Sequence, residues 1–141
     1  EYEQALQWYE KARLIREKIL GKDHPKTASS YNGIATVYSR MGEYEQALQW
    51  YEKALVIQEK VLEKKHPDTA FTYNDIALVY SNMGEYEKAL ILYQQAYKVI
   101  HHLVPNHPNT QTCYNNMFDA YLKSGLPPAD LQSWLSSPAP D

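Results

Sequence analysis

Three histidines recur along the sequence, and their side chains are the first candidates for chemistry. His24, His66 and His107 each precede a proline, and imidazole nitrogen is a common ligand of zinc. Zinc ligands must lie within ~2.0–2.1 Å of one ion, whereas neighbouring helical units pack about 10 Å apart. Three successive loops therefore do not bring these side chains to one metal. We expect no metal site, and we expect each histidine to cap its own loop.

The single cysteine is the next candidate for a reactive group. Cys113 would act as a nucleophile only if a nearby base or positive charge favoured its thiolate, and the sequence indicates no such partner. We therefore expect a buried or half-buried inert thiol. The sequence contains no phosphate-binding loop and no GxSxG, HExxH or CxxC motif. We expect no catalytic residues and no cofactor, and an enzyme would require a catalytic domain outside these residues.

Asparagine recurs at one position of a repeated segment, as Asn32, Asn74 and Asn115. Asparagine is a mediocre helix former within a helix, so its threefold recurrence needs a reason. Its amide offers two donors and an acceptor, which suits the backbone of a peptide that crosses the helices. The alternative is that each asparagine bridges to an adjacent helix. The sequence leaves both interpretations open.

The elements that position these residues are repeated almost letter for letter. EYEQALQWYEKA occupies residues 1–12, returns unchanged at 43–54, and reappears as EYEKALILYQQA at 85–96. Segments that begin with His-Pro and end with glycine lie at 24–42, 66–84 and 107–125. Self-similarity at a period between 20 and 50 residues indicates a stack of structural repeats.

Each repeat predicts two helices. The first runs from about Pro25 to Arg40, because proline suits a first helical turn and one apolar stripe follows at helical spacing, formed by Tyr31, Ile34, Ala35 and Tyr38. Gly42 is expected to end it in a left-handed conformation. The second runs from about Tyr44 to Leu62. Neither helix buries its stripe alone, so we predict an all-α fold: a right-handed α-solenoid of antiparallel helix pairs.

The predicted array covers residues 1–125. Residues 1–21 are the second helix of a truncated repeat, 25–63 and 67–104 are two repeats, and 108–125 form the first helix of a degenerate repeat. A terminal capping helix is expected at 126–136, and a flexible tail rich in proline and serine at 137–141.

The order of large and small residues resembles that of tetratricopeptide repeats. The residues that match the family's pattern are Tyr31, Ile34, Ala35, Tyr38, Ala47, Tyr51 and Ala54. The next repeat has matching residues at the equivalent positions. The 42-residue period, with HPxTA, YNxIAxVY and GEYExAL, resembles the kinesin light chain type. This resemblance implies that first helices line a concave groove for a peptide, with asparagine in contact with it. The implied groove residues are Asn32, Asn74, Asn115, Ser29, Thr36, Ser39, Phe71, Leu78, Ser81 and Asp119.

The charge balance argues against two classes of partner. Seventeen acidic residues exceed fourteen basic ones, and the net charge is −3, whereas a nucleic-acid-binding surface is normally basic and clustered. No apolar run approaches the ~20 residues of a membrane span. We expect no nucleic acid and no membrane as partner.

A lone cysteine fits a reducing compartment, so a cytoplasmic location is expected.

The expected function is that of a scaffold for protein–protein interaction, which binds a peptide segment of a partner protein in the groove without catalysis. The alternative is a structural module that self-associates or acts as a spacer within a larger protein. Residues 1–20 lack a first helix, so their apolar face is bare. That uncapped N-terminal helix is the expected site of a homo-oligomer.

Overall fold

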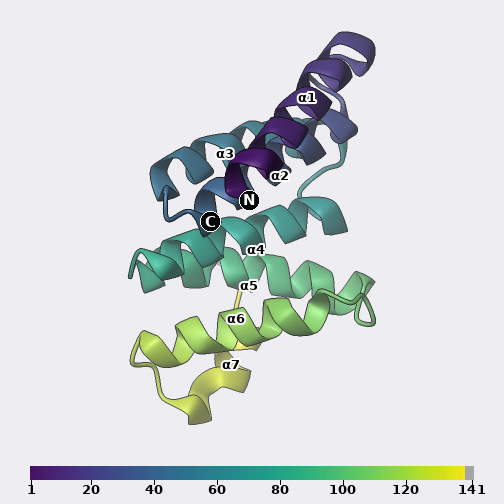
Figure 1. Ribbon diagram of the computed structural model, residues 1–141. Coiled ribbons are helices and arrows are strands. Elements are labelled where there is room, and N and C mark those ends of the chain that lie inside the picture. The colour runs from purple at the N-terminus through teal and green to yellow at the C-terminus, as the bar shows by residue number, and fades with distance from the viewer. Residues whose placement is uncertain (139–141) are drawn as a thin grey trace. The chain divides into compact units, whose positions relative to one another are not determined.

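The computed structural model describes residues 1–138, and helices joined by short turns make up this part of the chain (Figure 1). Residues 1–138 contain seven α-helices, one 3₁₀ helix and no strand. The elements are α1 (Tyr2–Leu20), α2 (Pro25–Arg40), α3 (Tyr44–Val61), α4 (Pro67–Asn82), α5 (Tyr86–Leu103), α6 (Thr110–Lys123), η1 (Pro128–Asp130) and α7 (Leu131–Ser136). The prediction of an all-α fold is confirmed. Helix α2 has the expected bounds, and α3 ends one residue before the expected Leu62.

The three recurrent histidines stand shortly before first helices, and each accepts a backbone hydrogen bond in its own loop. His24 is the N-cap of α2, whereas the N-cap of α6 is Asn109, two residues after His107. In His24 and His66, Nδ1 accepts a hydrogen bond from the backbone N–H two residues later, at 3.0 Å in both cases. In His107 the same bond, from the N–H of Asn109, measures 3.1 Å. At His24 and His66 the donor lies in the first turn and has no partner within the helix; at His107 the donor is the N–H of the N-cap residue Asn109. The prediction that these histidines cap their loops is confirmed.

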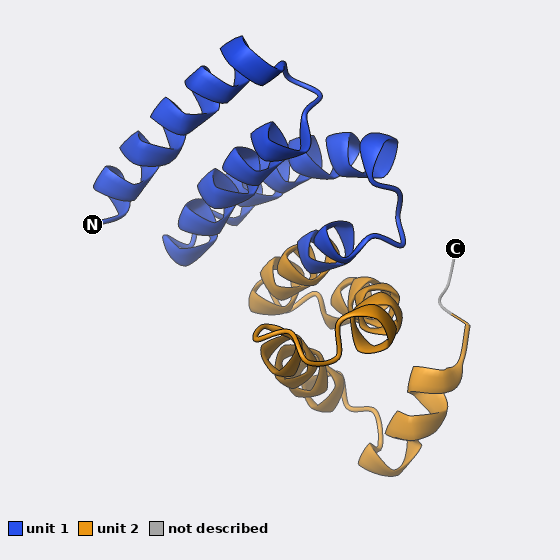
Figure 2. Cartoon of the chain, turned by 90° about the vertical axis from the view of Figure 1, so that its right-hand side faces the viewer, with its two compact units in different colours: residues 1–72 blue, residues 73–141 orange. Residues whose placement is uncertain are grey.

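The chain divides into two compact units, residues 1–72 and residues 73–141, and the boundary falls within α4 (Figure 2). In the first unit α2 and α3 are joined by a tight turn, in which Gly42 has the expected positive φ, 79°. Alanine, isoleucine and aromatic side chains fill the contact between the two helices. These are Ala28, Tyr31, Ala54 and Ile57, with Trp50 packed against them.

Helix α1 packs against α2 through an unusually close contact. The ring of Tyr9 lies over Gly33, where an added Cβ would be only 2.2 Å from the Tyr9 Cε1 atom. Charged side chains also join the two helices. Arg16 Nη1 donates to the carbonyl oxygen of Lys26 at 2.9 Å and contacts the Ser30 hydroxyl at 2.8 Å.

In the second unit, α5, α6 and α7 enclose a core in which Tyr93, Met117 and Tyr121 are almost fully buried. The expected capping segment 126–136 contains η1 and α7. Leu135 of α7 is buried, and the ring centroid of Trp134 lies 5.2 Å from that of Tyr121. Of the expected tail, Ser137 is hydrogen-bonded to α5, and residues 139–141 lie outside the described residues.

Candidate peptide-binding face

The ten residues expected to line the groove all come from first helices. Helix α2 carries Ser29, Asn32, Thr36 and Ser39; α4 carries Phe71, Asn74, Leu78 and Ser81; α6 carries Asn115 and Asp119. Within each helix they are spaced by three or four residues, so they share one face of that helix. We name these three helix faces together the first-helix face.

In the first unit, the polar side chains of this face mainly join one helix to another. Asn32 Nδ2 donates to the Thr72 hydroxyl at 2.9 Å, and Asn32 Oδ1 is buried without a hydrogen-bond partner in the described part of the chain. The Thr36 hydroxyl lies 2.9 Å from the Tyr51 hydroxyl. Ser39 is half-buried, and Ser29 is exposed. The amide of Asn32 therefore spans from α2 to the start of α4.

In the second unit, Asn74 repeats this bridging position. Its side chain is buried, and Nδ2 donates to the carbonyl oxygen of Cys113 at 3.5 Å, a long contact. Asn115 is exposed instead, and its Oδ1 accepts from Gln111 Nε2 at 2.9 Å. Asp119 is exposed and forms an ion pair of 2.9 Å with Lys123. The three equivalent asparagines thus differ in exposure: Asn74 is buried, Asn32 is half-buried and Asn115 is exposed.

Apolar side chains replace polar ones on the α4 part of the face. Phe71 and Leu78 are half-buried, and they occupy the positions that Ser29 and Thr36 hold on α2. Ser81 is buried. The α4 part of the face therefore presents apolar side chains that can contact the side chains of a peptide.

Two features of the second unit were missed by sequence reasoning. Burial raises the pKa of the Asp75 carboxyl to about 7. Tyr93 is fully buried, and its hydroxyl has no hydrogen-bond partner among residues 1–138. The signal for both lies in comparing repeats position by position. Asp75 stands where the neighbouring repeats have Gly33 and Asn116, and Leu78 stands where Thr36 supports the tyrosine hydroxyl.

The groups with catalytic potential have unreactive surroundings. Cys113 is half-buried, and burial raises the pKa of its thiol to about 12, which keeps it protonated and weakly nucleophilic. Among residues 1–138, no three His, Cys, Asp or Glu side chains gather closely enough to hold a metal ion. Within the same residues, no helix combines the length and apolar character that crossing a membrane requires.

A family model of the tetratricopeptide repeat matches the chain over residues 1–60 and 31–100, so together the two matches cover more than half of it. A model of the PPR repeat matches residues 112–128. No curated protein matches the sequence.

Several solved structures share the fold. One is BtubC (BKLC) from P. vanneervenii, with a TM-score of 0.77 and 20% identity, covering 88% of this chain and 50% of that one. Another is a putative kinesin light chain with nearly identical TPR-like repeats from Podosopora anserina, with a TM-score of 0.76 and 24% identity, covering 94% and 62%. A single-residue variant of that protein has the same TM-score and identity, covering 94% and 61%. The chain thus spans between half and about three-fifths of these structures.

Proposed function

The chain belongs to the tetratricopeptide repeat family, whose members generally mediate protein–protein interaction, and on this premise we propose that it binds a peptide segment of a partner protein along its first-helix face. The binding involves no catalysis. The observation that carries the proposal is the exposed polar face of α6, where Asn115 and Asp119 lie side by side at helical spacing. An asparagine amide can bond both the N–H and the carbonyl of a peptide backbone.

Of the three recurrent asparagines on the first-helix face, two use their side-chain amides within the fold. Asn32 and Asn74 use their amide nitrogens within the fold, so their replacement would disturb helix packing as well as any bound peptide. Asn115 makes its bond within one exposed turn of α6, to Gln111. Asn115 is therefore the residue whose removal tests binding without breaking a bond between helices.

The test is a selection from a random peptide library on the purified chain, followed by affinity measurement of an enriched peptide. Asn115→Ala should weaken binding about fivefold, as expected for the loss of one neutral hydrogen bond. Gln49→Ala is the matched control, because Gln49 is an exposed amide on the second helix α3 and should not affect binding. If no peptide is enriched, or if Asn115→Ala binds as tightly as the parent chain, the first-helix face is not the binding surface.

A second candidate function is self-association through α1, and one observation favours it. Ile15 on α1 is 58% exposed, whereas Ile57 at the equivalent position of α3 is only 5% exposed. Ile57 packs beside Ala28 and Tyr31 of its own first helix. No helix among the described residues gives α1 an equivalent cover, so a second copy of the chain is the proposed partner.

A further inference from the structure

Asp119 is the one charged residue among the ten of the first-helix face. It stands on α6 one turn after Asn115, so the two side chains share one face of that helix. The Asp119 side chain is 59% exposed. A peptide that is bonded at Asn115 therefore passes beside an accessible carboxylate.

The Asp119 carboxylate is not used to join α6 to another helix. At the equivalent position of α2, the Thr36 hydroxyl lies 2.9 Å from the hydroxyl of Tyr51 on α3. Among residues 1–138, Asp119 has one ion pair, with Lys123 on its own helix at 2.9 Å. Both side chains are more than half exposed, and an ion pair of this kind adds little to stability. The carboxylate is therefore available to a cation of a partner without loss to the fold.

Leu122 provides apolar surface next to this carboxylate. It stands three residues after Asp119 on α6 and is 43% exposed, so the two side chains are neighbours on the helix surface. Lysine and arginine pack their aliphatic stems along apolar surface while the charged end stays in a polar environment. The combination of Leu122 and Asp119 suits a side chain of this type.

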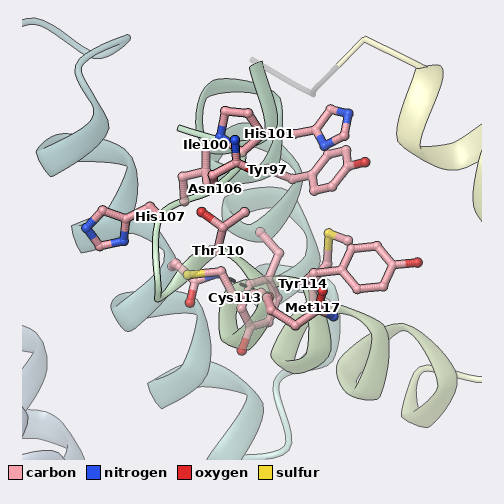
Figure 3. Close-up of a pocket in the computed structure, with 13 residues that line it drawn as sticks. Tyr97, Ile100, His101, Asn106, His107, Thr110, Cys113, Tyr114 and Met117 are labelled. Atoms are coloured by element: carbon pink, nitrogen blue, oxygen red, sulfur yellow. Dashed lines mark hydrogen bonds between the residues drawn. The ribbon is translucent and has the colours of Figure 1, made fainter. Parts of the chain in front are cut away.

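The pocket of the second unit offers no partner for a charged side chain. It has a volume of about 390 Å³ and lies between the C-terminal half of α5, the loop that follows it, and α6 (Figure 3). Gln111, which bonds Asn115, belongs to its lining, but none of the thirteen lining residues is Lys, Arg, Asp or Glu. A cationic side chain of a peptide at Asn115 therefore finds its partner at Asp119 and not in this pocket.

The charge of the second unit favours the same kind of partner. Residues 73–141 contain six acidic and three basic residues, whereas residues 1–72 contain eleven of each. The net negative charge of the chain thus belongs to the unit that contains α6. Such an excess attracts a cationic peptide and speeds its association.

We propose that the peptide bound along the first-helix face carries a lysine or arginine, whose charged end pairs with the Asp119 carboxylate and whose stem lies on Leu122. The two carboxylate oxygens accept this cation together with Lys123. Asn115 and Asp119 are about 6 Å apart along α6, a length that an extended lysine or arginine side chain spans. The inference rests on the proposed function, because it names the peptide that the same face binds.

The test is a selection from one random peptide library on three purified chains in parallel: the parent chain, Asp119→Asn and Asp130→Asn. We expect lysine and arginine to be enriched at one peptide position on the parent chain, and this enrichment to disappear on Asp119→Asn. Asp130→Asn is the matched control, because Asp130 is an exposed carboxylate of the same unit that lies on η1, outside the first-helix face. It should leave the enrichment unchanged.

The affinity of one enriched peptide then measures the ion pair. It should fall about fivefold on Asp119→Asn, and by the same factor when the basic residue of the peptide is replaced by methionine. The two changes together should weaken binding no more than either change alone, because they remove the same ion pair. Lys123→Met removes the cation that competes for Asp119 and should strengthen binding.

The outcomes separate this inference from the proposed function. If the enriched peptides lack a basic residue, or bind Asp119→Asn as tightly as the parent chain while Asn115→Ala weakens them, the peptide site stands and the pairing with Asp119 is wrong. An equal loss of enrichment on Asp130→Asn would show an effect of net charge alone and would also overturn the pairing. If no peptide is enriched, the first-helix face is not a binding surface, and the inference fails with the proposed function.

Discussion

At the scale of single residues, Glu63 holds a backbone conformation that suits glycine. Its φ is 74°, and it is the one non-glycine residue with positive φ among residues 1–138. The equivalent position after α1 is Gly21, with φ 90°. For an L-residue with a side chain, a left-handed conformation costs roughly 1–2 kcal/mol.

Replacing Glu63 by glycine should therefore stabilise the chain by about 1 kcal/mol, although the greater freedom of glycine in the unfolded chain offsets part of the gain. The melting temperature measured by circular dichroism checks the prediction. The reciprocal change, Gly21→Ala, should lower it, because Gly21 has φ 90° and ψ 165°, a region essentially restricted to glycine. A lower melting temperature for Glu63→Gly would contradict this explanation.

Asp75 should make the stability of the chain depend on pH. Burial raises its pKa in the folded state to about 7, above the ordinary value of 3.8. The folded chain then binds the proton more tightly than the unfolded chain, so this carboxyl lowers the free energy of unfolding as the pH rises from about 4 to about 7. Asp75 retains partial solvent contact, and we expect a loss of about 2 kcal/mol by pH 8.

The variant Asp75→Asn removes this titration and should be more stable than the parent chain at pH 8, with little difference at pH 4. Asparagine already stands at the equivalent position of α6, as Asn116, so the amide fits a first helix. Urea unfolding at the two pH values measures the effect. A difference between variant and parent chain that is the same at both pH values would show that Asp75 does not titrate as described.

At the scale of elements, helix α7 is held to α5 by one buried amide. Gln94 Nε2 lies 2.6 Å from the carbonyl oxygen of Trp134, 3.1 Å from that of Ser137 and 2.9 Å from the Ser137 hydroxyl. Lys98 Nζ also donates to the carbonyl oxygen of Ser137. These bonds join α5 to the carbonyl groups of Trp134, near the end of α7, and of Ser137, just after it; the Trp134 carbonyl also accepts from the Ser137 N–H and hydroxyl.

Gln94→Ala should loosen α7, because it removes the hydrogen bonds of the Gln94 amide to Trp134 and Ser137 and opens a gap beside them. We expect a cost of about 1–3 kcal/mol. Hydrogen exchange should become faster in α7 while α2 and α3 keep their protection. Gln132→Ala, an exposed position on α7, is the matched control and should leave exchange unchanged. Unchanged protection of α7 in Gln94→Ala would show that its apolar contacts suffice.

The helices themselves were predictable because their signals are local. Pro25 marks the start of α2, and the repeated spacing of alanine and tyrosine marks the buried stripes. The fates of the three asparagines were not predictable, since they depend on what the next first helix presents. Asn32 meets a threonine hydroxyl and Asn74 meets a backbone carbonyl, whereas Asn115 meets neither and is exposed.

At the scale of the whole molecule, each compact unit depends on contacts between neighbouring helices. In such repeat proteins, stability is approximately a sum of terms for the repeats and for their interfaces, and a terminal repeat needs a polar outer face. The C-terminal end has a short covering helix, α7. Helix α1 has no such cover among the described residues, and its apolar side chains remain in contact with water.

These side chains form one stripe on α1. Trp8 is 70% exposed and Ile19 is 73% exposed, and together with Ile15 they follow each other at helical spacing. Burying such a stripe against a second copy would remove it from water on both chains at once, since a two-fold interface uses the same surface twice. We therefore expect the chain to dimerise through α1, with an apparent mass that rises with concentration in sedimentation equilibrium.

The double variant Ile15→Lys/Ile19→Lys should stay monomeric at every concentration, because two lysines on each copy would place like charges and polar groups in the interface. The matched control is Val56→Lys/Val61→Lys, which introduces the same charge at two exposed apolar positions of α3 and should still dimerise. A parent chain that is monomeric throughout contradicts self-association. If the α1 variant still forms the dimer and the α3 variant does not, the interface lies on α3 and not on α1.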